Sequence, residues 1–154
     1  MDITITGTKN RYLNAIIHEA AEFYADILLD PRMSKKIVLD IDLHKKMDSQ
    51  GTCVNEDDTK NPRWFTINLR NRKEDDIIET LAHEMVHVKQ YAKNELSYRS
   101  SVNKGKGNTV AACWMGEEWK PRGKEDPYFD SPWEVEAFGR GVGLYDRFLR
   151  RNEK

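Results

Sequence analysis

Apolar residues recur at helical spacing in three stretches of the chain. They fall in residues 11–29, in residues 71–94 and in the stretch that begins at Ser131. Apolar positions three and four residues apart line one side of a helix, so each stretch predicts an amphipathic helix with one buried face. Prolines agree with two of the boundaries. Pro31 follows the first stretch, and Pro132 stands in the first turn of the third, where its missing N–H is tolerated.

Two shorter stretches have the composition of β-strands. Residues 36–44 alternate between apolar and polar positions with a period of two, which predicts a strand with one solvated face. Residues 63–69 are rich in Trp, Phe, Thr and Ile and predict a second strand, while the polar segment 45–62 between them predicts a loop. We expect these two strands to pair antiparallel. The expected fold class is α+β, with a small antiparallel sheet packed on helices.

The segment between about residues 97 and 130 differs in composition from the rest of the chain. It is rich in Gly, Lys, Ser and Pro, and only residues 110–119 interrupt this composition. Gly116 can turn a short hairpin there. We expect a surface insertion within a single domain that covers residues 1–154, because this length is the usual size of one domain.

Charge and hydropathy argue against several classes of partner. The chain has 25 Lys and Arg against 26 Asp and Glu, so its net charge of -1 gives no electrostatic basis for binding nucleic acid or an anionic membrane. The first ten residues contain no apolar run of signal-peptide length, and no apolar cluster elsewhere is long enough to cross a bilayer. We expect an intracellular (cytoplasmic) protein, whose oligomeric state the sequence leaves open.

The clearest chemical motif lies inside the second predicted helix. Residues 83–87 read His-Glu-Met-Val-His, and a spacing of four residues places both imidazoles on one face of a helix, one turn apart. There His83 and His87 can share a tetrahedral ion, and zinc is the metal that imidazole and carboxylate ligands favour. Glu84 projects about 100° round the helix from His83, so it can reach a water molecule on the metal without being a ligand.

A catalytic zinc site usually has a third protein ligand and one open position. No histidine follows His87, so a family whose third ligand is a downstream histidine, such as the metzincins, does not fit. The third ligand is then expected to be a carboxylate on another helix. Two upstream residues are alternatives. His44 ends the first predicted strand, and Cys53 would match the ligand set of peptide deformylases, although the glycine- and glutamine-bearing segments of that family are absent.

A second motif lies at the start of the last predicted helix. Residues 132–137 read Pro-Trp-Glu-Val-Glu-Ala, and Glu134 begins a Glu-x-x-Ala arrangement similar to the glutamate helix of gluzincins. Together with the motif helix and the strand pair, this resembles a small gluzincin of the thermolysin clan, the compact minigluzincin kind also found among short phage-encoded metallopeptidases. The resemblance implies a zincin-like fold with the His-Glu-x-x-His motif on a central helix. It also implies that Glu134 is the third zinc ligand.

The chain departs from the gluzincin pattern at one position. Many gluzincins place an Asp four residues after the ligand glutamate to orient a ligand histidine, and here that position is Phe138. Support for the histidines must then come from another residue.

Glu134 also has an explanation in local helix geometry. Ser131 followed by Glu at the third helical position is a capping box, which stabilises a helix start without any metal. Glu136 is the substitute ligand for Glu134, although its spacing to Arg140 equally suits an i, i+4 ion pair.

The sequence therefore predicts a zinc metallopeptidase that hydrolyses peptide bonds of a peptide or protein substrate. Glu84 would act as general base toward the attacking water and then as general acid toward the leaving amine. Tyr91, Tyr128 and Tyr145 are each able to stabilise a developing oxyanion, and the pattern does not distinguish among them. The alternative is a zinc-stabilised binding or assembly protein without catalytic turnover.

Overall fold

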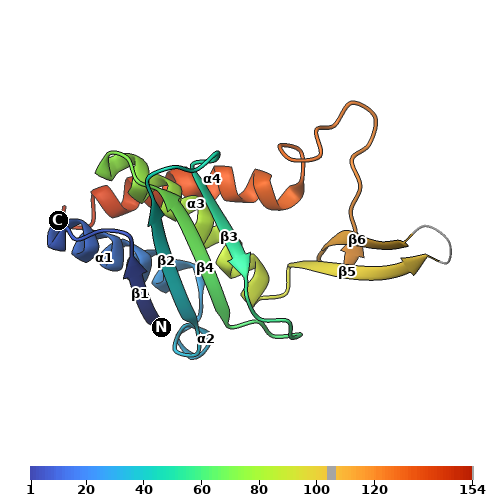
Figure 1. Cartoon of the computed structure of the whole chain (residues 1–154), viewed down its shortest axis with the longest axis horizontal. Coiled ribbons are helices and arrows are strands. Elements are labelled where there is room, and N and C mark those ends of the chain that lie inside the picture. Colours follow the sequence, from blue (N-terminus) through green and yellow to red (C-terminus); the bar gives the residue numbers. More distant parts are fainter. Residues whose placement is uncertain (104–106, 154) are drawn as a thin grey trace.

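The computed structural model describes residues 1–103 and 107–153, which form two small sheets and four helices (Figure 1). The strands are β1 (Asp2–Thr6), β2 (Val38–His44), β3 (Gly51–Asn55), β4 (Trp64–Arg70), β5 (Leu96–Asn103), β6 (Gly107–Trp114) and β7 (Glu117–Glu118). The helices are α1 (Arg11–Leu28), α2 (Pro31–Ser34), α3 (Glu74–Ala92) and α4 (Pro132–Leu149). This mixed composition confirms the α+β fold class, and α1, α3 and α4 match the three predicted helices to within a few residues.

The larger sheet is mixed, not antiparallel as predicted. Its strand order is β1-β2-β4-β3, in which β1, β2 and β4 run parallel and only β3 runs antiparallel. The predicted antiparallel pairing of residues 36–44 with 63–69 is therefore wrong, because β2 pairs parallel with β4 and Val38 lies opposite Trp64. The cause is β3, a strand inside the predicted loop 45–62. The turn before β3 reverses the chain direction and the turn after β3 reverses it again, so β4 runs in the direction of β2.

The first strand was not predicted either, although its sequence alternates as a strand should. β1 pairs parallel with β2, with Asp2 opposite Val38, and α1 makes the connection between the two. Parallel neighbours require such a crossover, because a tight turn can only join antiparallel strands. Helix α1 begins where the side chain of Asn10 accepts hydrogen bonds from two backbone N–H groups of the first turn.

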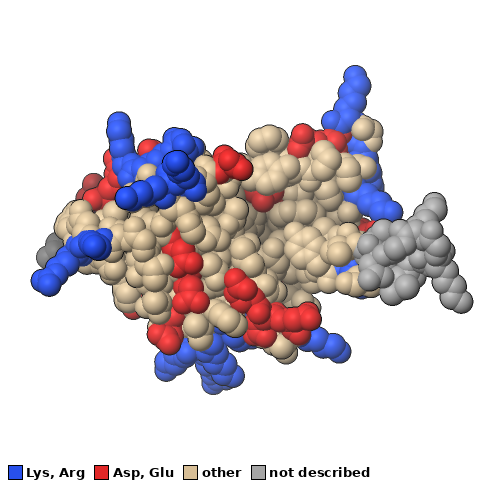
Figure 2. Space-filling model, viewed as in Figure 1, with Lys and Arg blue, Asp and Glu red and all other residues tan. Residues whose placement is uncertain are grey.

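The helices cover one face of this sheet, and the core lies between them (Figure 1). Alternate residues of β2 and β4 point inward and are buried, while the residues between them lie on the open face. Helix α3 is in contact with α1, α4, β3 and β4, so it bridges the sheet and the other helices. Figure 2 shows acidic side chains over the open face of the sheet. In the described part of the chain, none of the helices is long and apolar enough to cross a membrane.

The predicted insertion at residues 97–130 contains a second sheet of order β5-β6-β7. The β5–β6 hairpin extends away from the larger sheet and its helices (Figure 1). The predicted turn at Gly116 is confirmed, since Met115 and Gly116 both have positive φ and join β6 to β7. Strand β5 was not predicted, because three of its eight residues are serine and only Leu96, Tyr98 and Val102 are apolar. Residues 104–106 of the predicted insertion lie outside the described residues.

Candidate metal centre

Helix α3 holds the His-Glu-x-x-His residues next to α4 and the edge strand β3. Residues four apart on a helix lie one turn apart on the same face, and the Nε2 atoms of His83 and His87 are 3.2 Å apart. Glu84 lies on the side of β3, where an added Cβ on Gly51 would be 3.1 Å from its Oε1. Glu84 and His87 are both buried.

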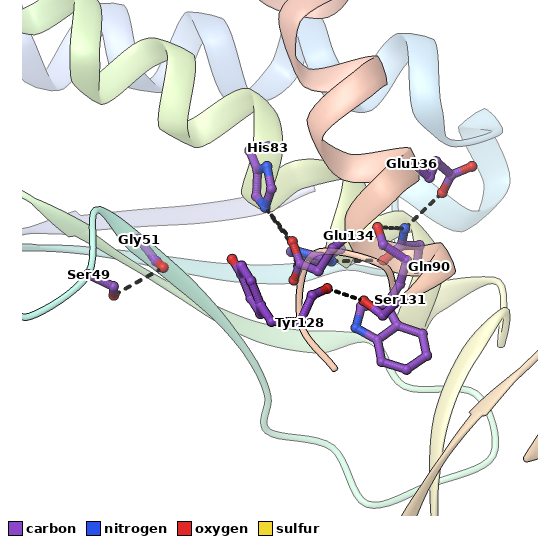
Figure 3. Close-up of polar contacts among 10 residues, drawn as sticks. Ser49, Gly51, His83, Gln90, Tyr128, Ser131, Glu134 and Glu136 are labelled. Atoms are coloured by element: carbon purple, nitrogen blue, oxygen red, sulfur yellow. Dashed lines mark hydrogen bonds and ion pairs between the residues drawn. The ribbon is translucent and has the colours of Figure 1, made fainter. Parts of the chain in front are cut away.

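Helix α4 brings Glu134 against both histidines. Its Oε2 lies 3.1 Å from Nε2 of His83, and its Oε1 lies 3.2 Å from Nε2 of His87. Figure 3 shows His83 and Glu134 pointing toward each other from the two helices. Glu134 is only 6% exposed, so this carboxylate is removed from solvent. Residues 51 positions apart in the sequence therefore meet in one cluster, which we call the His–Glu cluster: His83, His87 and Glu134.

The capping-box explanation of Glu134 does not hold in the structure. Ser131 is the N-cap residue of α4, but its side chain accepts no hydrogen bond from the helix. Its hydroxyl instead donates to the backbone oxygen of Tyr128 at 2.7 Å. The carboxylate of Glu134 is thus free to face α3.

A glycine allows the two helices to approach closely at the cluster. An added Cβ on Gly141 of α4 would lie 3.2 Å from Cα and 3.3 Å from the backbone nitrogen of His83. Such distances are tighter than ordinary contact, and both neighbours are backbone atoms that cannot rotate away. Gly141 therefore determines how near α4 can lie to the first motif histidine.

The three donors suit a zinc ion in chemistry and in spacing. Zinc binds His nitrogen and carboxylate oxygen at about 2.0–2.2 Å, so the corners of its tetrahedron are roughly 3.3–3.6 Å apart. The two imidazole Nε2 atoms are 3.2 Å apart, close to such an edge, and each lies 3.1–3.2 Å from a different oxygen of Glu134. One ligand atom from each of the three residues lies within 4.8 Å of the other two. These residues fit a zinc site with two imidazoles, one carboxylate and a fourth position for water.

The protonation of the cluster also suits a cation. Burial alone would raise the pKa of Glu134, but hydrogen bonds and charge from His83 and His87 outweigh it and lower the pKa to about 2. Burial would lower the pKa of His87, but its hydrogen bond to Glu134 and the charge of Glu84 raise the pKa above its ordinary value. Glu134 is therefore ionised, and among the described residues only the two histidines form ion pairs with it.

Glu84 is held in a different environment from Glu134. Burial raises its pKa above the ordinary value, and the charges of His87 and His83 only partly oppose this. A carboxylate whose pKa is moved toward neutrality is better suited to accept and return a proton.

Two cavities meet at the cluster. The larger, about 370 Å³, lies on the side of His83 and is mostly apolar, with Phe129, Phe138 and Val142 in its wall. The smaller, about 200 Å³, lies on the side of His87, between β3 and the start of β5. Glu84, Gly51 and Tyr128 line both, so the carboxylate of Glu84 stands at their junction.

The structure distinguishes among the three candidate tyrosines. Tyr128 lines both cavities, and burial together with the charge of Glu134 raises its pKa, which keeps its hydroxyl protonated. Tyr91 lines only the smaller cavity and stacks on Phe65. Tyr145 lines neither of these two cavities. Tyr128 is thus the tyrosine of the three that can donate a hydrogen bond at the junction.

The other candidate ligands lie elsewhere. Glu136 faces away from the His–Glu cluster, and its oxygens accept hydrogen bonds from Nζ of Lys89 at 3.0 and 2.8 Å. His44 is bonded through Nε2 to Oδ1 of Asn68 at 2.8 Å. Cys53 lines the smaller cavity, but it is not among the three converging donors, and burial raises the pKa of its thiol.

Sequence reasoning did not identify Gln90, Gly51 or Gly141, each of which touches the site. Gln90 follows His87 by three residues on the same helix, so helical spacing offered a signal for it. The glycines carried no such signal, because their role depends on which element approaches them in space.

Comparisons with protein-family models, with curated proteins and with solved structures found no match to this chain. The function proposed below therefore rests on the residues of this chain and on their geometry.

Proposed function

We propose that this chain is a zinc metallopeptidase of the gluzincin type, with a zincin-like fold centred on α3. The single observation that carries the proposal is the convergence of His83, His87 and Glu134, from two helices, beside a buried glutamate that lines a cleft. The position of Glu84 at the junction of two cavities adds to this observation, because a purely structural contact between the histidines and Glu134 does not require it.

His83, His87 and Glu134 would hold the ion, and zinc bound there would polarise a carbonyl group and lower the pKa of a water molecule toward about 7. Glu84 would accept the proton of the attacking water and deliver it to the nitrogen of the leaving amine. Its raised pKa supports both halves of this task, because the protonated form must also be accessible. The hydroxyl of Tyr128 would donate to the oxygen on which negative charge develops.

The substrate would be an extended peptide segment. β3 is the edge strand of the larger sheet, so its outer N–H and C=O groups have no neighbouring strand in that sheet. A peptide that pairs with this edge passes directly over Glu84, because Gly51 at the start of β3 contacts it. The larger cavity would receive an apolar side chain beside the cleaved bond, since its wall is mainly aromatic and aliphatic.

Glu84→Gln is the variant that tests this function. The amide keeps the size of the side chain but cannot accept the proton, so hydrolysis should fall by at least about a thousandfold, as for loss of general acid–base catalysis together with its charge. Zinc content should stay at one ion per chain, because Glu84 is not a ligand. The assay would follow a mixture of synthetic peptides by mass spectrometry, and elemental analysis would measure zinc.

Glu79→Gln is the matched control, since Glu79 lines the larger cavity but is not among the donors around the cluster. It should retain hydrolysis. Equal turnover by the wild type and Glu84→Gln would refute the role of Glu84. A wild type that binds zinc but cleaves no peptide in the mixture would favour the zinc-stabilised binding protein instead.

A further inference from the structure

The imidazole of His87 has a second partner on the side away from Glu134. Its Nδ1 lies 2.8 Å from Oε1 of Gln90, one turn further along α3. Gln90 is 0% exposed, so its amide has no alternative partner in solvent, and His87 is also buried. Breaking a buried hydrogen bond of this kind costs free energy, so the orientation of the Gln90 amide constrains His87.

The surroundings of Gln90 determine which end of its amide faces His87. The amide nitrogen donates to the backbone oxygen of Trp133 and to Oε1 of Glu136, both at 2.9 Å (Figure 3). A carbonyl and a carboxylate only accept hydrogen bonds, so both require the nitrogen end. Lys89 donates two hydrogen bonds to Glu136 and keeps it ionised. The amide oxygen is therefore the end that faces His87.

We infer that Gln90 is a positioning residue that sets the tautomer of His87 for metal binding, with Glu136 and the backbone of Trp133 fixing Gln90 in turn. An amide oxygen accepts but never donates, so Nδ1 of His87 must carry a proton. In the neutral ring Nε2 then keeps its lone pair, and Nε2 is the atom that faces His83 and Glu134. The inference rests on the proposed function, because it takes the His–Glu cluster to be a zinc site.

The two motif histidines are oriented by different contacts. His83 packs edge-on against Phe138, with ring centroids 4.5 Å apart and ring planes at 68°. Among the described residues no hydrogen bond to Nδ1 of His83 is found, whereas His87 has Gln90. Phe138 stands where the gluzincins that the sequence resembles have an aspartate. In this chain the hydrogen-bond support therefore goes to the second histidine and comes from its own helix.

Two variants separate this role from simple packing. Gln90→Met keeps the length of the side chain and removes the acceptor, so the Nδ1–H group of His87 becomes a buried donor without a partner. Zinc affinity, measured by competition with a chelating dye, should fall about 10- to 100-fold, as when other outer hydrogen-bond partners of zinc ligands are lost. Val88→Ala is the matched control, because Val88 is a fully buried apolar residue of the same helix, so the change removes packing and leaves the hydrogen bond of His87 intact. Its zinc affinity should stay within about threefold of wild type.

The tautomer can be read without metal and without activity. The chain has only four histidines, so long-range ¹H–¹⁵N spectra of ¹⁵N-histidine protein can resolve His87. In the metal-free wild type, at a pH where His87 is neutral, Nδ1 should carry the proton. Gln90→Met should give a mixture of tautomers, and Val88→Ala should keep the Nδ1–H form.

Three results would overturn the inference. They are unchanged zinc affinity in Gln90→Met, an equal loss of affinity in Val88→Ala, and a wild-type His87 with its proton on Nε2. Failure of the proposed function would look different. In that case the wild type would cleave no peptide, while the tautomer and affinity measurements would still give the pattern expected above.

Discussion

Two buried polar clusters lie between α3 and α4, and they differ in how their negative charge is balanced. In the first, Glu134 faces His83 and His87. In the second, which we call the lysine cluster, Lys89 lies 2.5 Å from Glu95 and 2.8 Å from Glu136. The two glutamates of α4 are only two residues apart, yet one is paired with a permanent cation and the other with imidazoles, whose charge depends on pH.

This difference separates a structural carboxylate from a candidate ligand. A buried ion is stable only when it is paired and hydrogen-bonded, and Lys89 provides this for Glu136 at any pH where proteins are usually studied. Imidazoles provide it for Glu134 only while they hold a proton, and a divalent ion would provide it when they do not. Charge balance, more than sequence spacing, thus distinguishes Glu134 from its neighbour in the same helical turn.

The largest expected effect compares the two glutamates directly by zinc affinity. Glu134→Ala should weaken zinc binding on the order of a thousandfold, because the roughly 10–16 kcal/mol of a zinc site is shared among three or four ligands. Glu136→Ala should weaken it by less than about tenfold, since Trp133 still holds the amide of Gln90. Dye competition at one pH measures both. Equal losses would show that charge balance does not mark the ligand.

An intermediate effect concerns the stability of the metal-free protein. Lys89→Met removes the buried cation of Glu136 and Glu95 and leaves only the more exposed Arg140, 4.0 Å from Glu136. The free energy of unfolding should therefore fall by about 3 kcal/mol, as for a buried pair that loses one partner. Glu134→Gln keeps a hydrogen-bonding group beside the histidines, and at alkaline pH, where the imidazoles carry no charge to pair with a carboxylate, it should change this free energy by about 1 kcal/mol or less. Urea unfolding with a chelator present measures both variants. A larger loss for Glu134→Gln would reverse the assignment of the structural cluster.

The smallest effect tests the helix contact beside His83. Gly141→Ala places a Cβ 3.2 Å from the His83 backbone, so α4 must shift by a few tenths of an ångström. Zinc affinity should fall several-fold, and the gain in helix propensity of about 1 kcal/mol should be lost to strain. Gly139→Ala is the matched control, because nothing lies within 4 Å of its added Cβ. It should raise the free energy of unfolding by about 0.5–1 kcal/mol and leave zinc affinity unchanged. Identical behaviour of the two variants would contradict the close approach.

The sequence by itself determined the elements that depend on local pattern. Periodic apolar residues determined α1, α3 and α4, because one face of each helix must be buried. Alternation determined β2, and a composition rich in β-branched and aromatic residues determined β4. Helical spacing also placed His83 and His87 on one face, since four residues nearly complete one turn. The choice of Glu134 over Glu136 was available only through a family resemblance.

Tertiary structure decided what depends on groups far apart in the chain. The direction of β4 relative to β2 depends on β3. The five residues of β3 have the composition of a loop and form a strand because they pair with the edge of β4. The alternating residues of β1 likewise form a strand because they pair with β2. Three residues have roles that depend on neighbours from other elements: Gln90, Gly51 and Gly141. Local sequence determines which face of an element is apolar, but hydrogen-bond partners, close approaches and the balance of buried charge depend on which elements pack together.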